Sequence, residues 1–370
     1  MYARKQWLGL VAVVITCIFT IVGFAGGYYA GYRDTKNTGP EKLGWFSILT
    51  SGFDSITAEE ILGHIEYLAG PEPLGRNAGT EGNLKAGQYL AGQLSSYGFK
   101  PFVGSYFQNF NFADVKNPST SLNDIAKWRG YGYSINARGR NVIGVLEGTS
   151  KKNEFVLLIA HYDHWGMQQG KLYPGADDNA SGTSGVLEVA EALGILARQG
   201  IRPERSVIVA FFDAEDWGEW GSAYFAENPP VALDQMVAVI NLDMIGRNAH
   251  NDVLIIGSPE LDDMPSRNPD MWRMAQKANS VLSLNLILPG QELREEQIFW
   301  RSDHASIFRA SSVNNRIPVL FLNTGEHADY HKPTDTADKI DGQKAKNITR
   351  LALLIVWQTA ESPDKPDYIE

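Results

Sequence analysis

Six short apolar segments, separated by stretches with a helical pattern, limit the folds that this chain can adopt. The segments are rich in Val, Ile, Leu and Phe, and they lie at 141–148, 154–161, 205–212, 236–243, 252–257 and 317–323. Continuous apolar strands between helices indicate a largely parallel sheet that is covered on both faces. The sequence therefore predicts an α/β domain of three layers, αβα, around a mixed, largely parallel central sheet.

Apolar residues at helical spacing predict the helices of this domain, at 181–199, 221–227, 268–283, 302–310 and 341–360. Two amphipathic helices precede the strands. One is expected to begin after Thr57, because a hydroxyl residue followed three positions later by Glu60 is typical of a helix N-terminus. The other covers Leu84–Tyr97. The 370 residues show no internal repeat, so we expect one large domain at 56–370.

The N-terminal segment differs from the rest of the sequence. Gln6–Tyr32 contains no charged residue and follows Arg4 and Lys5. About 20 apolar residues span a bilayer as a helix, whereas the apolar stretch of a cleaved signal peptide has about 7–15. We therefore expect residues 1–32 to be a membrane anchor, with secretion after signal cleavage as the alternative. The basic pair predicts a cytoplasmic N-terminus and an extracytoplasmic (periplasmic or extracellular) domain after a tether at 33–55.

Charge and cysteine content exclude several classes of protein. The formal net charge is −10, so we expect no nucleic-acid partner, because nucleic-acid-binding proteins use a basic surface to contact phosphates. The single cysteine, Cys17, cannot form a disulfide within the chain or a cysteine-based zinc site. The sequence makes no prediction of the oligomeric state.

Acidic residues and histidines follow the predicted strands, at their ends or in the next loop. In α/β sheets the carboxyl ends of the strands border the crevice in which ligands bind. The residues there that could carry chemistry are His161, Asp163, His164, Asp177, Asp178, Asp213, Glu215, Asp216, Asp243, Tyr330, His331 and Asp335. Because these residues come from several strands, the sequence predicts one site at one edge of the sheet.

The excess of carboxylates in this set predicts bound cations. Two unit charges about 4 Å apart repel by about 4 kcal/mol at an effective dielectric constant of 20. Histidine and carboxylate ligands without cysteine suit zinc, or less selectively cobalt or manganese. Two divalent ions would balance the charges of Asp177, Asp216, Asp243 and one bridging hydroxide, whereas a single ion would leave the site negative. We therefore expect two Zn²⁺ ions per chain.

Several short motifs occur in a particular order along the chain. They are HxD at 161–163, GADDNASG at 175–182, AEDxGxxGS at 214–222, NLDMIG at 241–246, SDH at 302–304 and YHxxxDT at 330–336, and LGRNAGTEGN at 74–83 precedes them. In this order they resemble metallopeptidase family 28, which includes aminopeptidase Y, the secreted bacterial leucyl aminopeptidases and the glutamate carboxypeptidases. The resemblance extends from about residue 56 to about residue 340 and implies a fold of the zinc-exopeptidase type.

The resemblance implies a metal role for five residues. Asp177 would bridge the two zinc ions, His161 and Asp243 would complete one ligand set, and Asp216 and His331 would complete the other. The chain departs from the family at one of them, because the family usually has Glu where this chain has Asp216. Aspartate still coordinates zinc but is one methylene shorter, so we expect a displaced metal or a tighter loop.

The resemblance also implies the catalytic residues. Glu215 would be the general base that takes a proton from the bridging water and passes it to the leaving amine, and Tyr330 would donate its hydroxyl to the oxyanion. Asp163 lies two residues after His161 on an extended segment, so it should face the same side and orient the His161 ring. The family often has a cis peptide bond after the bridging aspartate, here Asp177.

Two other activities stay open. Glutaminyl cyclases share this fold, use one zinc ion and have FFDGEE where this chain has FFDAED at 211–216. Carboxypeptidases of acidic dipeptides need a cation for the substrate carboxylate, and Arg247 is a candidate. The complete ligand set favours a di-zinc hydrolase over a cyclase or a metal-free, receptor-type relative. Acids beside the metals would attract a free α-amine, so we predict an aminopeptidase that acts on peptides with a free N-terminus.

Overall fold

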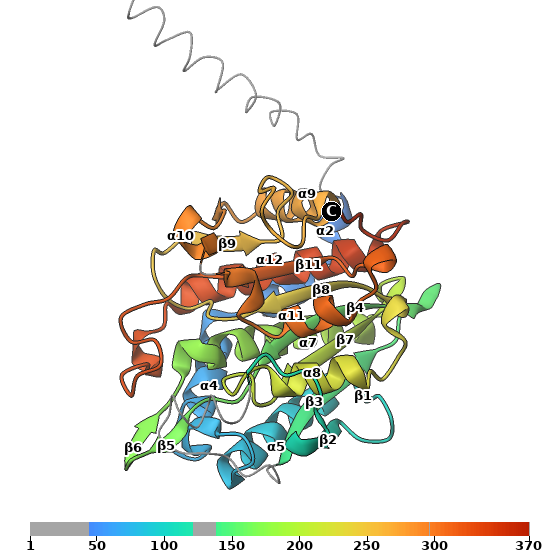
Figure 1. Ribbon diagram of the computed structural model, residues 1–370. Coiled ribbons are helices and arrows are strands. Elements are labelled where there is room, and N and C mark those ends of the chain that lie inside the picture. Colours follow the sequence, from blue (N-terminus) through green and yellow to red (C-terminus); the bar gives the residue numbers. More distant parts are fainter. Residues whose placement is uncertain (1–43, 121–137, 296, 370) are drawn as a thin grey trace, which may run out of the picture. The chain divides into compact units, whose positions relative to one another are not determined.

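The computed structural model describes residues 44–120, 138–295 and 297–369 (Figure 1). The chain divides into two units, residues 1–50 and 51–370. In the first unit the structure describes helix α2, Gly44–Ser47. The predicted anchor at 1–32 and the tether up to residue 43 lie outside the described residues, so the anchor stays a prediction. In the described part of the chain, no helix combines the length and the apolar character that a membrane span needs.

A sheet of nine strands forms the centre of the second unit. Within the described residues its order is β1–β3–β7–β4–β8–β11–β9–β10, with β2 also paired to β3, and β5 and β6 form a separate hairpin. The strands are β1 Lys100–Pro101, β2 Phe107–Asn111, β3 Arg138–Leu146, β4 Lys151–His161, β5 Gly166–Gln168, β6 Lys171–Tyr173, β7 Arg205–Phe212, β8 Met236–Leu242, β9 Asp252–Ile256, β10 Asn285–Ile287 and β11 Val319–Asn323.

The sheet is mixed, as predicted from the sequence. Its four central strands, β7, β4, β8 and β11, are parallel to one another. On one side, β1 and β2 pair antiparallel to β3, which pairs antiparallel to β7; on the other side, β9 pairs antiparallel to β11 and parallel to β10. The connection 243–251 between β8 and β9 contains no helix, and parallel strands need a longer crossover, usually a helix, between them. The six apolar segments of the sequence are the strands β3, β4, β7, β8, β9 and β11.

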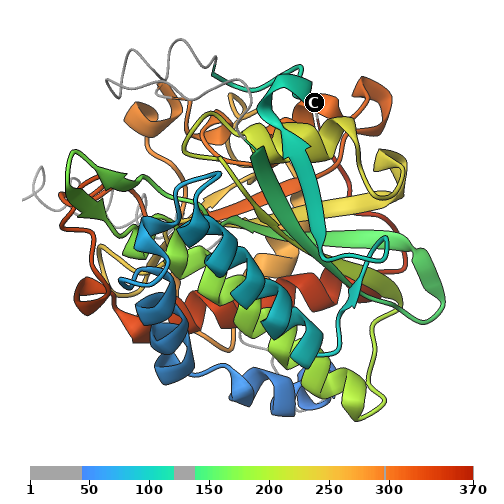
Figure 2. The same ribbon diagram turned by 90° about the horizontal axis from the view of Figure 1, so that it is seen from below.

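Helices cover both faces of the sheet and complete the three predicted layers. Helices α4, α5, α7 and α12 pack beside one another on one face, with α9 against α12, and α8 and α11 pack together on the other face (Figures 1 and 2). The helices are α3 Thr50–Ser55, α4 Ala58–Leu68, α5 Glu81–Ser96, α7 Gly182–Arg198, α8 Trp220–Glu227, α9 Pro269–Asn279, α10 Gln291–Glu295, α11 His304–Ala310 and α12 Gly342–Glu361.

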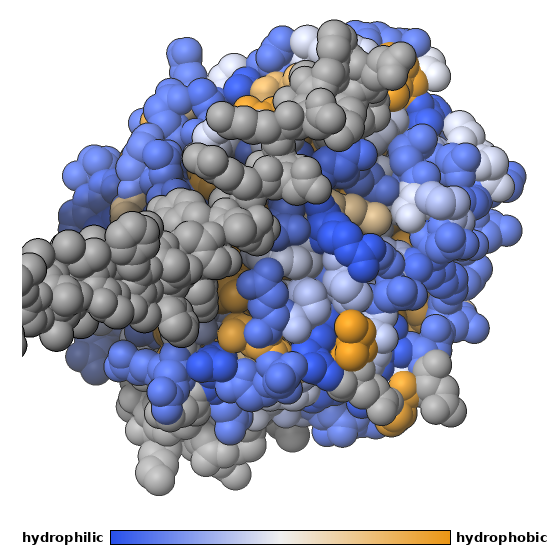
Figure 3. Space-filling model, turned by 90° about the horizontal axis from the view of Figure 1, so that it is seen from above, coloured by the Kyte–Doolittle hydropathy of each residue, from blue (hydrophilic) through white to orange (hydrophobic). Residues whose placement is uncertain are grey.

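Local sequence signals explain where these elements form. The Thr57 hydroxyl accepts a hydrogen bond from the backbone N–H of Glu60 at 3.1 Å, which caps the N-terminus of α4 as predicted. All eight residues of β7 are buried, because helices cover both faces of the central strands. On the outer face seen in Figure 3, hydrophilic side chains dominate among the described residues and hydrophobic ones occur in small groups. Most apolar residues of β4, β7, β8, β11 and α12 are buried, so the core of the described residues lies between the layers.

Lys344, in the first turn of α12, connects this helix to the loop that follows β8. Its side chain is buried, and its ammonium group donates hydrogen bonds to the backbone carbonyls of Arg247 and Ala249, the latter at 2.8 Å. Burial lowers the pKa of Lys344 to about 8, below its usual value of 10.5. The folded chain therefore holds this lysine neutral between about pH 8 and 10.5, whereas the unfolded chain binds the proton.

We expect this group to make the free energy of unfolding rise with pH over that range, because the unfolded state binds more protons there. Below pH 8 the cost of burying the charged amine is present in full, and it is relieved as the pH approaches 10.5. The stability advantage of the wild type over Lys344→Met should therefore increase from pH 8 to 10.5. Urea unfolding of both proteins at several pH values measures this difference, and a constant difference would contradict the prediction.

Candidate metal centre

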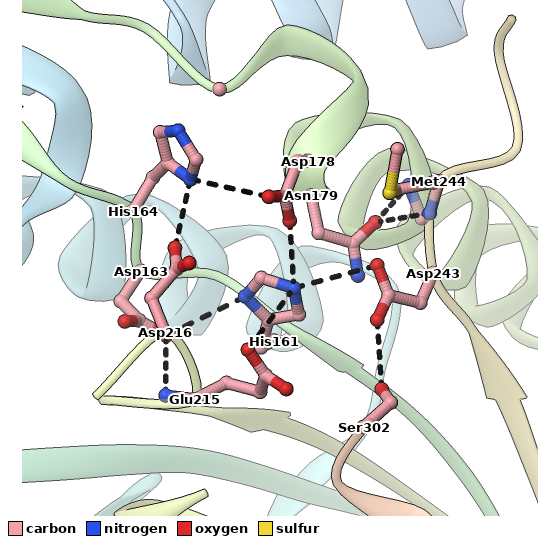
Figure 4. A network of polar contacts seen from close by, with 12 residues as sticks. His161, Asp163, His164, Asp178, Asn179, Glu215, Asp216, Asp243, Met244 and Ser302 are labelled. Carbon is pink, nitrogen blue, oxygen red and sulfur yellow. Dashed lines mark hydrogen bonds and ion pairs between the residues drawn. The ribbon is translucent and has the colours of Figure 1, made fainter. Parts of the chain in front are cut away.

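The predicted site residues come together at the carboxyl ends of the parallel strands. His161 is the last residue of β4 and lies opposite Phe212, the last residue of β7, and β8 ends at Leu242 beside them. Glu215, Asp216 and Asp243 therefore follow their strands at the same edge. Here a cavity of about 460 Å³ is bordered by carboxylates, a histidine, aromatic residues and two arginines. Figure 4 shows the polar contacts among the residues of this edge.

Asp178 lies between two histidines from distant parts of the chain. Its Oδ1 is 3.2 Å from Nε2 of His161, and its Oδ2 is 3.0 Å from Nε2 of His331. Burial and the neighbouring Asp216 act to raise the pKa of Asp178, but the two histidines outweigh them and hold it below its usual value. One buried carboxylate thus presents one oxygen to each histidine, which is the arrangement of a shared ligand.

The structure corrects the position predicted for that shared ligand, which was Asp177. Oδ1 of Asp177 accepts a hydrogen bond from the backbone N–H of Gly246 at 2.7 Å, and its Oδ2 is 3.3 Å from Nε2 of His327. These contacts hold Asp177 away from His161. The cis peptide bond expected after Asp177 likewise lies one residue later, between Asp178 and Asn179.

Asp216 lies beside His331 in the turn after β7. Its Oδ1 is 3.3 Å from Nε2 of His331 and accepts a hydrogen bond from Nε1 of Trp165 at 3.0 Å, and its Oδ2 is 2.8 Å from Nδ1 of His164. Although burial opposes it, contact with the two histidines holds the pKa of Asp216 well below its usual value. Asp178, Asp216 and His331 therefore form one group.

Asp243, directly after β8, lies on the other side of Asp178. Its Oδ1 is 3.5 Å from Nε2 of His161, and its Oδ2 accepts a hydrogen bond from the Ser302 hydroxyl at 2.8 Å. Asn241 donates to that hydroxyl and also contacts Nδ1 of His304. Ser302 of the SDH motif thus contacts Asp243 directly, and His304 of the same motif is connected to it through Asn241 and Ser302.

Glu215 and Asp163 lie next to His161. The backbone N–H of Glu215 donates to Oδ1 of Asp163 at 2.9 Å, and the same oxygen is 3.6 Å from Nδ1 of His161. Oε2 of Glu215 is 4.0 Å from Nε2 of His161. Burial and the carboxylates around it, first Asp303, raise the pKa of Glu215 well above its usual value, although His161 opposes the shift. Asp163, just beyond the end of β4, thus lies on the Nδ1 side of the His161 ring.

Tyr330 borders the cavity next to His331. The two rings stack with their centroids 3.7 Å apart. Burial, then the carboxylates of Asp178 and Asp216, raises the pKa of Tyr330 well above its usual value. The phenol therefore keeps its proton at neutral pH and can act as a donor.

The residues present fit a metal site. Among the described residues, several buried atoms of the group have no hydrogen-bond partner: both ring nitrogens of His161, Oδ2 of Asp178 and Oδ1 of Asp243. Leaving a buried polar atom unpaired costs about 1–3 kcal/mol. Ligand atoms of His161, Asp178 and Asp216 lie within 4.8 Å of one another. Nitrogen and carboxylate oxygen donors without sulfur are a ligand set that zinc accepts.

Arg76, whose role the sequence did not reveal, holds the loops around this site. Its buried guanidinium donates to the backbone carbonyls of Leu68, Tyr162, Pro174 and Gly175 at 2.6–3.0 Å. Burial lowers the pKa of Arg76 to about 10, and the acids of the site oppose this shift. The LGRNAGTEGN segment that contains Arg76 resembles the family, but the sequence does not show which loops the arginine contacts, because they are distant along the chain.

Asp335 fixes the segment that carries Asp178. Its carboxylate accepts hydrogen bonds from the backbone N–H groups of Asp177 and Asp178 at 3.0 and 3.2 Å. Arg247, the candidate for binding a substrate carboxylate, is 2.9 Å from Asp329 and 3.9 Å from Asp335. It does not belong to the described residues that border the cavity. Arg247 therefore supports the loops instead of facing the cavity.

The fold has counterparts among solved structures. The structure of an aminopeptidase from Aneurinibacillus sp. strain AM-1 superimposes on this one with a TM-score of 0.62 at 18% sequence identity. The match covers 87% of this chain and 98% of the aminopeptidase chain. A Bacteroides thetaiotaomicron glutaminyl cyclase bound to N-acetylhistamine matches 81% and 97% with a TM-score of 0.58 at 22% identity. The chain therefore has the mixed α/β fold of the zinc aminopeptidases, a fold that also occurs in a glutaminyl cyclase.

The sequence comparison identifies the family. Residues 141–356, more than half of the chain, match the family model of peptidase family M28. The chain belongs to this family. It is 33% identical over 136 residues to a probable glutamate carboxypeptidase, LAMP1, of Arabidopsis thaliana. The aligned region covers 36% of this chain and 18% of that protein. It is 23% identical over 242 residues to aminopeptidase YwaD of Bacillus subtilis, 64% of this chain and 48% of that protein. The match thus spans about half or less of these relatives' lengths.

Proposed function

We propose that this chain is a zinc metallopeptidase with two zinc ions, and that it removes N-terminal residues from peptides. The observation that carries the proposal is the position of Asp178. Its two oxygens face His161 at 3.2 Å and His331 at 3.0 Å, so one carboxylate can serve two metal positions. The first position would be held by His161 and Asp243, the second by Asp216 and His331.

Zinc in these positions would supply a Lewis acid that polarises the scissile carbonyl and lowers the pKa of water. Glu215 is the general base in this proposal. Its carboxylate takes a proton from the attacking water and returns it to the amine that leaves. Asp163 positions His161 and Glu215 in this proposal. Its Oδ1 faces Nδ1 of His161 and accepts a hydrogen bond from the backbone N–H of Glu215.

Tyr330 would donate its hydroxyl to the oxygen that becomes negative during attack on the carbonyl. Its ring is held by stacking on His331, so the hydroxyl has a defined position in the cavity wall. Four acids of the cavity wall, Asp178, Glu215, Asp216 and Asp243, favour the free α-amine of a peptide by charge. The substrate class is therefore peptides with an unblocked N-terminus.

A second function has one observation in its favour. Arg301 and Arg309 border the cavity, paired with Glu326 and Glu219. Either cation could receive a substrate carboxylate, as a carboxypeptidase of acidic dipeptides requires. A glutaminyl cyclase is the third possibility within the fold, but a single-zinc enzyme would not need the ligand pair Asp216 and His331 in addition to His161 and Asp243.

The test is a substrate panel for the full chain, with zinc supplied and then removed by a chelator. It contains aminoacyl-anilides, the same compounds with blocked N-termini, acidic dipeptides with a blocked N-terminus, and a peptide that begins with glutamine. We expect zinc-dependent release of the aniline from the unblocked aminoacyl-anilides and no reaction with the blocked compounds. Release of the C-terminal residue only from the blocked acidic dipeptides would establish a carboxypeptidase instead. Loss of ammonia from the peptide that begins with glutamine would establish a cyclase. Elemental analysis should give two zinc ions per chain.

A further inference from the structure

We propose that His164 and Trp165 hold Asp216 in its metal-binding position and so confer affinity on the second metal position selectively. The inference rests on the proposed function, because it takes Asp216 and His331 as ligands of that position. Aspartate is one methylene shorter than glutamate, so its carboxylate reaches less far from the backbone. Neighbouring side chains can compensate by fixing the carboxylate and the loop that carries it.

Each oxygen of Asp216 has its own nitrogen partner in this pair. Nδ1 of His164 is 2.8 Å from Oδ2, and Nε1 of Trp165 donates to Oδ1 at 3.0 Å. The Asp216 side chain is almost fully buried, at 2% exposure. Two nitrogen partners on a buried carboxylate fix both its position and its plane, because each bond restricts a different oxygen.

His164 is itself held tightly. Its side chain is fully buried, and its ring packs directly against the turn at Gly175, where a Cβ atom would lie 2.4 Å from the Cγ of His164. Nδ1 of His164 is also 3.8 Å from Oδ2 of Asp178. The ring therefore sits between the turn that leads to Asp178 and the carboxylate of Asp216, and it sets the spacing of these two proposed ligands.

Trp165 contacts the remaining ligand of the second position. The centroid of its indole is 4.8 Å from that of the His331 ring and 5.3 Å from that of Tyr173 in β6. One residue thus touches both Asp216 and His331. In the first position, Asp243 receives its hydrogen bond from Ser302 instead. His164 is within hydrogen-bond distance of Asp216, whereas it lies 3.8 Å from the shared Asp178. A change at His164 should therefore affect the second position more than the first.

The experiment is a zinc titration of the full-length protein against a competing chelator, for the wild type, His164→Ala and His164→Asn. Loss of a group that orients a metal ligand typically weakens metal binding about 10- to 100-fold. We expect His164→Ala to weaken zinc binding at one of the two sites by this factor and to weaken the other site by a clearly smaller factor. His164→Asn retains a side-chain N–H donor near Nδ1 and should recover most of the affinity.

His64→Ala is the matched control, because His64 is another buried histidine paired with an acid, Glu188, far along the chain from these residues. It should leave both zinc affinities unchanged. Equal affinities in wild type and His164→Ala, or equal losses at both sites, would overturn the inference. Binding of fewer than two zinc ions by the wild type would instead contradict the proposed function, so the two failures can be told apart. Thermal unfolding of the zinc-free proteins reveals any general loss of stability.

Discussion

Asp178→Asn is expected to remove metal binding at both positions, whereas Asp177→Asn should leave both zinc ions bound. The reason is the direction of the two side chains. Asp178 presents one oxygen to His161 and one to His331, so neutralising it weakens both ligand sets at once. The loss in affinity should exceed about 100-fold, the upper end of what loss of an outer hydrogen-bonding partner costs.

Asp177 is the matched control because it is the same residue type at the next position. Its carboxylate accepts from the backbone N–H of Gly246 and faces His327, so Asp177→Asn should reduce the free energy of unfolding by at most about 1–3 kcal/mol. Elemental analysis after gel filtration gives the zinc content of both variants. Two zinc ions in Asp178→Asn, or a greater loss in Asp177→Asn, would show that the shared ligand is wrongly assigned.

Glu215→Gln is expected to reduce kcat by about 10²- to 10⁴-fold, the contribution typical of a positioned general base. Glutamine has nearly the same shape but cannot accept the proton from water. The backbone N–H of residue 215 still donates to Asp163 in this variant, so the fold and the zinc content should be unchanged. Steady-state kinetics on an aminoacyl-anilide, together with zinc analysis, measures both properties.

Glu188→Gln serves as the control for that substitution. Glu188 is also a buried glutamate, but it lies in α7 and pairs with His64 of α4 at 3.2 Å. Its replacement should not change kcat. Turnover of Glu215→Gln close to that of the wild type would exclude Glu215 as the base, whereas a loss of zinc in this variant would indicate that it acts as a ligand instead.

The class of fold and the edge that carries the site could be predicted from local patterns. Apolar runs without alternation belong to strands covered on both faces, and the structure has them as β3, β4, β7, β8, β9 and β11. The carboxyl ends of parallel strands share one edge. His161 and Asp243, each directly at or after a strand end, are therefore neighbours, 3.5 Å apart. Prediction of the edge succeeds because strand direction determines it, and the pairing of β4 with β8 then makes these two residues neighbours.

Prediction failed where the backbone is irregular. Asp177 and Asp178 are adjacent, chemically identical and part of the same motif, so the sequence could not distinguish them. The backbone of Asp178 leaves the helical conformation, with φ −104° and ψ 96°, and this conformation decides which carboxylate faces the histidines. Gly246, His327 and Asp335 fix the choice through their contacts with Asp177 and Asp178, and all three are distant in the sequence.

The sequence by itself thus determined the layered α/β fold, the family and the edge of the sheet at which acids and histidines collect. Only the tertiary structure decided that Asp178 faces both His161 and His331, that Arg76 joins the loops, and that His164 and Trp165 contact Asp216. The physical reason is that strand and helix patterns follow from local residue spacing. The direction of a loop side chain, in contrast, depends on hydrogen bonds to partners far away in the chain, and no local pattern encodes them.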